Sequence, residues 1–438
     1  MLLQIVPAVA SQMVTLVYNL ADTYFVGMLN APHETSAVTV AYPSFLMLTA
    51  ISNLFGVGGA SAIARALGRQ DEEGARRIAA VSLAGGLLSA LLFSAAFRLL
   101  ADPVLHLCGA TEATYAAAYG YAKWVVILGG PFTILNTLLA NLVRAEGGAG
   151  AAAFGVSFGG VLNILLDPLF IFVFHMGVKG AALATILSQA VSAVWVVSFL
   201  CSGRSGLHIR REHLGFRPRV MGKIAALGVA PFIMQSTESL VTVVLNVGAQ
   251  KYGGDLYVTS ITILQSVMQV IGMPSHGITT GVQPIMSYNY GAKNYARVRA
   301  VFRRLLAVTM TVTTAAFLLV ALFPAAVALM FNDDPQLVTL VGRVMPLFFG
   351  GVWAFGAQVA CQSTFMALGQ AKTSLFLALL RKIILLVPLA VLLPWLSGSV
   401  MGLYAAEPVA DFLASATTLI LFLKRRKTLL PLKTQEED

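Results

Sequence analysis

An asparagine and an aspartate stand four residues apart in the apolar run 161–172, which reads VLNILLDPLFIF. Residues at positions i and i+4 lie on one face of an α-helix, so Asn163 and Asp167 present their oxygens together. Pro168 follows, and a proline in a helix frees the carbonyl four residues before it, here that of Ile164. This group predicts a site for a cation or a proton, and the alternative is a structural polar pair that kinks the helix.

The composition of the chain places this pair in a membrane. Of its 438 residues, 58% are hydrophobic and only 11% are charged, and the mean hydropathy is +0.81. A soluble domain of this size needs far more polar surface. Since a carboxylate inside a membrane span is costly and rarely faces lipid, Asp167 indicates a functional position.

The predicted fold is an all-α membrane protein with twelve transmembrane helices. A span needs about 20 apolar residues, and the chain supplies about twelve such runs. The first run leads directly into a full span, so no cleavable signal is evident. Three isolated cysteines, among apolar residues, give neither a disulfide framework nor metal spacing. The runs are 3–28, 36–63, 78–100, 115–143, 151–175, 179–201, 223–250, 257–285, 302–326, 337–367, 375–396 and 400–423.

Basic residues alternate between the two sides of these spans. Of 29 lysines and arginines, 24 follow an even-numbered span or lie in the tail, and this group includes Arg381 and Lys382. Such a bias predicts a multi-pass protein of the plasma (inner) membrane with both termini in the cytoplasm. The net charge of +10 does not indicate a nucleic-acid partner, because the basic residues lie in short loops between spans.

The two halves of the sequence repeat each other. Pro7 and Pro231 are 224 positions apart, and so are Asp22 and Asn246. The offset is 223 for Gly68 and Gly291, and 222 for the pairs Gly147 and Gly369, and Gly180 and Gly402. Each half has six spans, so the repeats share one orientation and we expect a pseudo-two-fold axis along the membrane normal. The predicted domains are an N-terminal six-helix bundle (1–201), a cytoplasmic linker loop (202–222) and a C-terminal six-helix bundle with a short basic tail (223–438).

Five stretches together resemble the multidrug and toxic compound extrusion (MATE) family. They are YNLADTYFVG in the first span, ALGRQDEEGARR after the second, RAEG after the fourth, LNILLDPLF in the fifth and VKGAALATILSQ in the sixth. The resemblance covers nearly the whole chain. It implies a secondary active antiporter, not an enzyme, that exports cationic, aromatic organic compounds in exchange for H+ or Na+ without a further cofactor. In the family's N-terminal bundle, four residues form the cation site, and they correspond here to Asp22, Asn163, Asp167 and Thr185.

Depth in the membrane independently favours these residues. At a rise of about 1.5 Å per residue, Asp22, Asp167 and Thr185 all come to lie roughly 9–12 Å inside the outer face. Hard cations take oxygen ligands, so with Asn163 the set forms a metal site if Na+ is the coupling ion. It also suits a proton, which two neighbouring carboxylates can share. The sequence leaves H+ and Na+ both open.

The acidic pair belongs to the N-terminal half alone. Asp22 corresponds to Asn246, and an alignment of Pro168 with Pro388 places Val387 where the first half has its aspartate. The C-terminal half has other intramembrane acids, of which Glu407 and Asp411 are again i and i+4 in the last span. The tenth span carries Gln358 and Gln362 but no acid, so a full second cation site is not expected.

The substrate cavity is expected between the two halves. Tyr18 precedes Asp22 by one helical turn on the same face, which makes it a candidate lining residue. Pro7 lies fifteen residues before Asp22, and because an interior proline permits a bend, it is the predicted hinge. The other candidate lining residues are Asn136, Glu238, Gln358 and Asp411.

The predicted partners are small organic cations and the lipid bilayer, and the protein is expected to be a monomer. The main alternative is a lipid-linked saccharide flippase of the same broader superfamily. A flippase would need a strongly cationic cavity for a diphosphate, whereas the candidate lining here is acidic or neutral. A membrane prenyl transferase would need paired carboxylates at the membrane face to hold magnesium and diphosphate, and no such motif is present.

Overall fold

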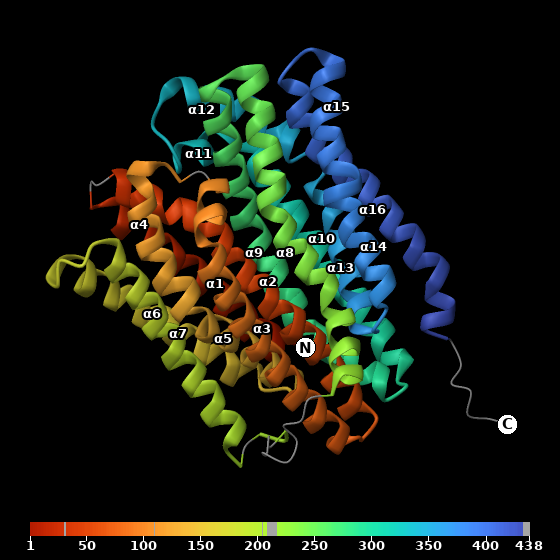
Figure 1. The fold of residues 1–438 in the computed structure, drawn as a ribbon. Helices are drawn as coiled ribbons and strands as arrows, with labels where there is room; N and C mark the ends of the chain where they lie inside the picture. The colour runs from red at the N-terminus through yellow and green to blue at the C-terminus, as the bar shows by residue number, and fades with distance from the viewer. Residues whose placement is uncertain (30–31, 109, 204, 208–216, 432–438) are drawn as a thin grey trace. The chain divides into compact units, whose positions relative to one another are not determined.

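The computed structural model describes residues 1–29, 32–108, 110–203, 205–207 and 217–431, and these form helices and loops without a strand among them (Figure 1). Ten helices are long and apolar enough to cross a membrane, and the number rises to twelve if each of two bent pairs counts as one span. The predicted all-α membrane fold is therefore confirmed.

Contacts within the chain define two compact units, Met1–Gln235 and Ser236–Asp438. Their boundary falls inside a helix, downstream of the predicted linker loop 202–222, in which residues 204 and 208–216 lie outside the described part of the chain. The first unit contains α1 (Leu2–Gly27), α2 (Pro32–Gly68), α3 (Glu72–Leu107), α4 (Glu112–Ala122), η1 (Lys123–Leu128), α5 (Gly130–Ala145), α6 (Ala149–Pro168), η2 (Leu169–Val173) and α7 (Val178–Cys201).

The boundary helix is α8 (Pro218–Gly253), whose first half belongs to the first unit and whose second half belongs to the second. The second unit continues with α9 (Asp255–Gly291), α10 (Tyr295–Leu322), α11 (Pro324–Leu329), α12 (Pro335–Phe348), α13 (Val352–Ala367), α14 (Ala371–Leu379), η4 (Leu380–Leu386), α15 (Val387–Ser397) and α16 (Met401–Leu429). The η segments are π-helical, and such wide turns are frequent at functional sites.

Two predicted spans are bent. The segment Thr114–Leu128 meets Gly130–Ala145 at 47°, and Pro335–Phe348 meets Val352–Ala367 at 50°. Glycines lie at both breaks, where the absence of a side chain makes unusual backbone conformations cheap. The bends fall in the fourth and the tenth predicted spans, which occupy the same place in each half of the sequence.

The backbone also repeats at the turns. The side chain of Asp71 accepts a hydrogen bond from the Gly74 amide at 2.8 Å and caps α3, and Asn294, 223 positions later, caps α10 in the same way. The residue before each cap, Gln70 and Lys293, has a positive φ of 61° and 55° respectively. The repeat seen in the sequence is thus a repeat of local structure.

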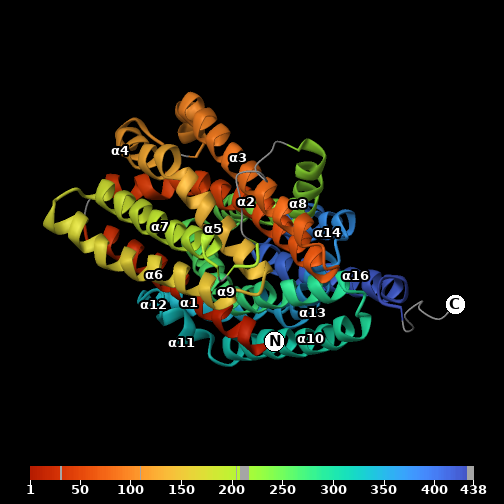
Figure 2. The same ribbon diagram turned by 90° about the horizontal axis from the view of Figure 1, so that it is seen from below.

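Three helices of the first unit position the predicted cation site. α1 packs against α6, and α6 packs against α7, so the three helices lie side by side in both views of the ribbon (Figures 1 and 2). α5 also packs against α7. A polar residue on the inner face of α6 is therefore enclosed by α1 and α7, which bring their own polar residues to it.

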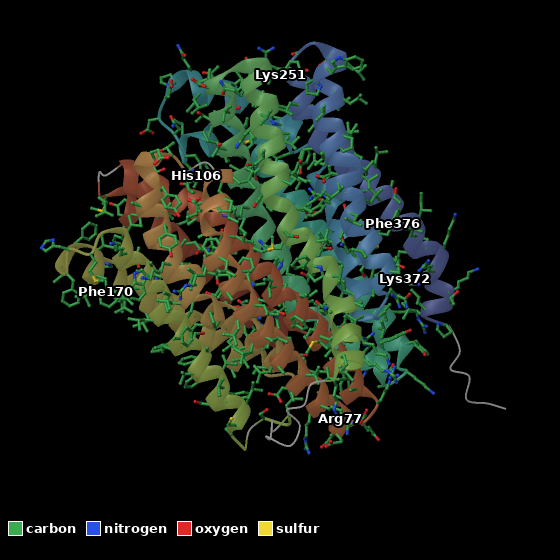
Figure 3. The ribbon with its side chains drawn as sticks, in the orientation of Figure 1. Arg77, His106, Phe170, Lys251, Lys372 and Phe376 are labelled. Atoms are coloured by element: carbon green, nitrogen blue, oxygen red, sulfur yellow. The ribbon has the colours of Figure 1, made fainter. Side chains whose placement is uncertain are left out.

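Side chains mark the two ends of each unit. In the first unit, Arg77 near the start of α3 and His106 near its end lie at opposite ends (Figure 3). In the second unit, Lys372 at the start of α14 and Lys251 at the end of α8 likewise lie at opposite ends. Arg77 and Lys372 belong to the basic group that the sequence places in the cytoplasm.

Two basic residues do not belong to that loop group. Arg381 and Lys382 lie ten and eleven residues after the start of the span Ala371–Ser397, well inside it. Their assignment to the cytoplasmic segments was wrong. A lysine or an arginine inside a span requires a partner or access to water, so these two positions need a separate explanation.

Candidate functional site

The asparagine and aspartate of α6 lie together in the first unit. Asp167 is completely buried, Asn163 is 1% exposed, and the Asn163 amide donates to Asp167 Oδ1 at 3.3 Å. The same amide lies 3.5 Å from the hydroxyl of Thr185 on α7. Helical i, i+4 spacing thus brings the pair to one face, and the packing of α6 against α7 adds the threonine.

The first-helix aspartate belongs to the same cluster. Asp22 on α1 interacts electrostatically with Asp167, and the hydroxyl group of Tyr121 on α4 lies within electrostatic range of both carboxyl groups. Tyr18 interacts with Asp22 in the same way. In the described part of the chain, neither carboxyl group has a basic side chain within ion-pair distance. The four residues that the resemblance implies therefore form a cluster without a cation of its own.

Several oxygens in this cluster lack a donor. Asp22 Oδ1, Asn163 Oδ1 and Asp167 Oδ2 are buried and accept no hydrogen bond. Leaving one buried polar atom unpaired costs about 1–3 kcal/mol. Three such acceptors at one place form an arrangement that a bound cation or proton would stabilise.

A small cavity lies beside the cluster and is named here the N-terminal cavity. Its volume is about 30 Å³, which holds a few waters or an ion but not a drug-sized molecule. Two predicted substrate residues, Tyr18 and Asn136, line it. The complete lining is Tyr18, Asn136, Val156, Gly159, Gly160, Asn163, Thr185, Ser188 and Gln189.

Two adjacent glycines in α6 allow its neighbours to approach closely. A Cβ atom on Gly160 would lie 3.0 Å from both Tyr18 Cδ1 and Val14 Cγ1 of α1. A Cβ atom on Gly159 would lie 2.9 Å from Ser192 Cβ of α7. Glycine at these two positions therefore sets the spacing of α1, α6 and α7 around the cavity.

Sequence reasoning missed three polar residues of this site, namely Tyr121, Ser188 and Gln189, and the three small or apolar lining residues Val156, Gly159 and Gly160. The signal for Gln189 was present, because it follows Thr185 by four residues and shares its helix face. Its buried Oε1 is also without a hydrogen-bond partner. For Tyr121 the signal was weaker, since it is one of several tyrosines in the run TYAAAYGYAKW of the fourth span.

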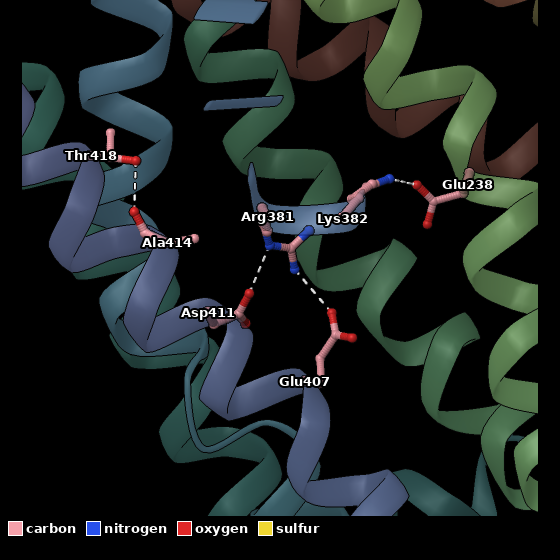
Figure 4. A network of polar contacts seen from close by, with 7 residues as sticks. All are labelled: Glu238, Arg381, Lys382, Glu407, Asp411, Ala414 and Thr418. Atoms are coloured by element: carbon pink, nitrogen blue, oxygen red, sulfur yellow. Dashed lines mark hydrogen bonds and ion pairs between the residues drawn. The ribbon is translucent and has the colours of Figure 1, made fainter. Parts of the chain in front are cut away.

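The second unit holds the other predicted acids in a network of charges. Arg381 donates to Asp411 Oδ1 at 2.7 Å and to Glu407 Oε1 at 3.0 Å, and Lys382 pairs with Glu238 (Figure 4). Glu238 and Asp411, predicted to line the substrate cavity, therefore already have cationic partners. The described contacts of these acids include none with Gln358, which is buried in α13 with its Oε1 unpaired.

Two further features bear on the predictions. The predicted hinge residue, Pro7, lies within α1, which runs as one helix from Leu2 to Gly27.

Among the described residues, no group of three or more His, Cys, Asp and Glu side chains is placed to hold a metal ion. The cluster on α1, α6 and α7 instead offers two carboxylates, an amide and a hydroxyl, a donor set that fits Na+ as well as a proton.

The sequence matches the family described as MatE over residues 7–169 and again over 231–392. The multidrug export protein MepA of Staphylococcus haemolyticus is 26% identical over 410 residues, which cover 93% of this chain and 90% of that protein. MepA of Staphylococcus aureus is 26% identical over 421 residues, with 96% and 92% covered.

Solved structures share the fold. A MOP superfamily transporter from Pyrococcus furiosus superposes with a TM-score of 0.91 at 24% identity, and the match covers 99% of this chain and 96% of the other. A multidrug resistance MATE family transporter in an outward-facing conformation gives a TM-score of 0.92 at 24% identity, with 98% and 95% covered.

Proposed function

Since the chain belongs to the MatE family of membrane transporters, we propose that it is a secondary active antiporter. It exports cationic, aromatic organic compounds in exchange for H+ or Na+ across the inner membrane. The relatives named multidrug export protein support drug export. The protein acts as a monomer with both termini in the cytoplasm.

The observation that carries the coupling is the group of unpaired buried acceptors on Asp22, Asn163 and Asp167. A proton or Na+ supplies the positive charge that this group lacks. Because a ligand shifts a conformational equilibrium only by its differential affinity, an ion bound here favours the conformation in which these oxygens converge.

The N-terminal cavity is large enough for the ion but too small for the drug. About 30 Å³ is too little for an aromatic cation, so the ion and the drug do not share this cavity. The ion therefore acts on drug binding through the arrangement of α1, α6 and α7.

The test is transport by the purified protein in lipid vesicles. Vesicles loaded with a fluorescent organic cation receive a proton gradient, a sodium gradient or neither. Export that follows one of the gradients supports the proposal and identifies the coupling ion. Equal dye movement with and without both gradients, in vesicles that retain folded protein, would contradict it.

Bending of α1 at Pro7 is proposed to link occupation of the ion site to access for the drug. Pro7→Ala restores the backbone hydrogen bond and stiffens the helix. We expect a folded protein whose turnover is severalfold slower, as measured by drug efflux from cells at equal expression. Unchanged efflux would show that α1 does not need to bend at this residue.

The predicted topology can be tested with single cysteines in a Cys-free background. Gly203→Cys, in the linker loop, and Lys427→Cys, at the end of α16, are both in exposed positions that the proposal places in the cytoplasm. Both should resist an impermeant thiol reagent added to intact cells. Met330→Cys, in the exposed segment after α11, should react rapidly and serves as the matched control. Rapid labelling at 203 or 427 would reverse the orientation.

A further inference from the structure

Five charged side chains form one network inside the second unit, well within its spans. Arg381 contacts Asp411 and Glu407 of α16, and Lys382 contacts Glu238 of α8 (Figure 4). The Arg381 guanidinium also lies over the ring of Phe355, 4.5 Å from its centre. Asp411 is 1% exposed and Arg381 is 13% exposed, so these two residues and Glu407 form a buried group, named here the C-terminal centre. Glu238, at the other end of the network, is 54% exposed.

Helix geometry explains how two adjacent basic residues of η4 reach two different helices. Successive residues of a helix point in directions roughly 90–100° apart, so neighbouring side chains readily reach different partner helices. Arg381 consequently points toward α16 and Lys382 toward α8 (Figure 4).

The sequence repeat identifies what stands at these positions in the first unit. α6 begins at Ala149 and α14 at Ala371, an offset of 222, which equals the offset between the left-handed glycines Gly147 and Gly369 before them. With this offset, Arg381 corresponds to Gly159 and Lys382 to Gly160. The alignment of Pro168 with Pro388, which matched Val387 to Asp167, differs from this register by two residues.

The same offset, anchored on Gly180 and Gly402, relates α7 to α16. Glu407 then corresponds to Thr185, and Asp411 to Gln189. Both residues of α7 line the N-terminal cavity. The two acids that hold Arg381 thus occupy the positions of two cavity-lining residues.

Contacts in the two units agree with this correspondence. Gly160 is packed against Val14 of α1, and Val14 corresponds to Glu238 at the offset of 224 set by Pro7 and Pro231. The packing contact between Gly160 and Val14 in the first unit therefore corresponds to the ion pair between Lys382 and Glu238 in the second.

The second glycine agrees as well. Gly159 is packed against Ser188 and Ser192 of α7, just as Arg381 contacts α16. The two positions that line the cavity as closely packed glycines in the first unit therefore carry two basic side chains in the second.

We propose that Arg381 is a tethered cation, a permanent occupant of the C-terminal counterpart of the N-terminal cavity. Its guanidinium supplies between Glu407 and Asp411 the positive charge that an exchangeable ion supplies beside Asp167. The comparison with an exchangeable ion rests on the proposed function. The C-terminal centre then takes up no coupling ion, and removal of the arginine side chain opens a vacant site for a guanidinium-type cation.

The chemistry of the centre specifies that class of ligand. Two carboxylates in a buried position hold the guanidinium by charge-assisted hydrogen bonds, and an aromatic face adds a cation–π contact. Removing one partner of a buried ion pair leaves uncompensated charge, which is strongly destabilising. The vacated site should therefore bind a free guanidinium ion and regain stability from it.

The test compares Arg381→Ala with wild type, both purified as the full chain. We expect the unfolding temperature of the variant to fall by several degrees and to recover in low-millimolar guanidinium chloride. Urea, the neutral analogue of similar shape, should not restore it, and the wild type should not respond to guanidinium. Titration calorimetry should find about one guanidinium site per variant chain and none in wild type.

A second variant removes all three charges, with Arg381→Met, Glu407→Gln and Asp411→Asn. Replacing both partners of a buried pair costs far less than removing one, so this variant should unfold at a higher temperature than Arg381→Ala. It also keeps the test decisive if Arg381→Ala cannot be purified. A triple variant as unstable as Arg381→Ala would show that the arginine does not act by neutralising the two acids, and the proposal would fail.

The N-terminal site provides the remaining control. Guanidinium binding by Arg381→Ala should persist when Asp167→Asn is added, because the two centres are separate. Loss of binding in that double variant, or its absence in Arg381→Ala, overturns the proposal. If wild-type vesicles show no ion-driven export, the proposed antiport fails, but the guanidinium titration still decides the role of Arg381.

Discussion

Replacement of either Asp22 or Asp167 by asparagine is expected to abolish ion-driven drug export. The substitution keeps size and polarity and removes the charge that binds the ion beside the unpaired oxygens of the site. Gradient-driven efflux from dye-loaded vesicles should fall at least about tenfold, the change that roughly 1.4 kcal/mol of lost differential affinity produces. Dye binding should persist in part, because apolar contacts contribute to it and the dye does not fit the ion cavity.

The matched control is Asp333→Asn, the same chemical change at an exposed residue of the segment between α11 and α12. It should export dye at the wild-type rate. If Asp22→Asn and Asp167→Asn both retained wild-type gradient-driven efflux while folded, the ion site on α1, α6 and α7 would have to be abandoned.

Most of this site could be predicted from the sequence, because its central pair of residues is close together in the chain. Asn163 and Asp167 share one helix turn, and a carboxylate in an apolar run has few structural explanations. The partners Asp22 and Thr185 came from the family resemblance and from similar depth. The structure places Asn163, Asp167 and Thr185 in contact and Asp22 within electrostatic range.

The C-terminal network could not be predicted in the same way. A basic pair near the start of a span resembles a cytoplasmic flank, and periodicity alone does not reveal that Arg381 pairs with α16 and Lys382 with α8. The pairing of Asp411 with Arg381 also joins residues 30 positions apart. Three acids that looked available in the sequence are thus already paired in the fold.

Two glycines that the sequence showed only as a repeat make equivalent backbone contacts in the two units. Gly180 and Gly402 are 222 positions apart, and each is pressed against the backbone of the helix that precedes its own. A Cβ atom on Gly180 would lie 2.7 Å from the carbonyl carbon of Phe170, and one on Gly402 would lie 2.5 Å from the carbonyl oxygen of Leu393. The repeat at these positions therefore reflects a repeated backbone contact between neighbouring spans.

Gly180→Ala is accordingly expected to damage both stability and ion coupling. The added methyl group meets backbone, which cannot rotate away, so α7 must shift from η2 at a cost of about 1–3 kcal/mol. That shift moves Thr185 of α7 relative to Asp167 of α6, which ends where η2 begins. The unfolding temperature in detergent should fall, and in vesicles the surviving protein should show weakened ion-driven export.

Two glycines serve as controls for this effect. Gly150→Ala adds a methyl group in the first turn of α6, where nothing lies within 4 Å, and should leave stability equal or slightly higher because alanine favours the helix. Gly402→Ala should destabilise the second unit to a similar degree but leave the contacts of Asp167 intact. The surviving Gly402→Ala protein should therefore keep its response to the ion gradient, and a loss of coupling as large as that of Gly180→Ala would show that the contact between α7 and η2 has no special role in holding the ion site.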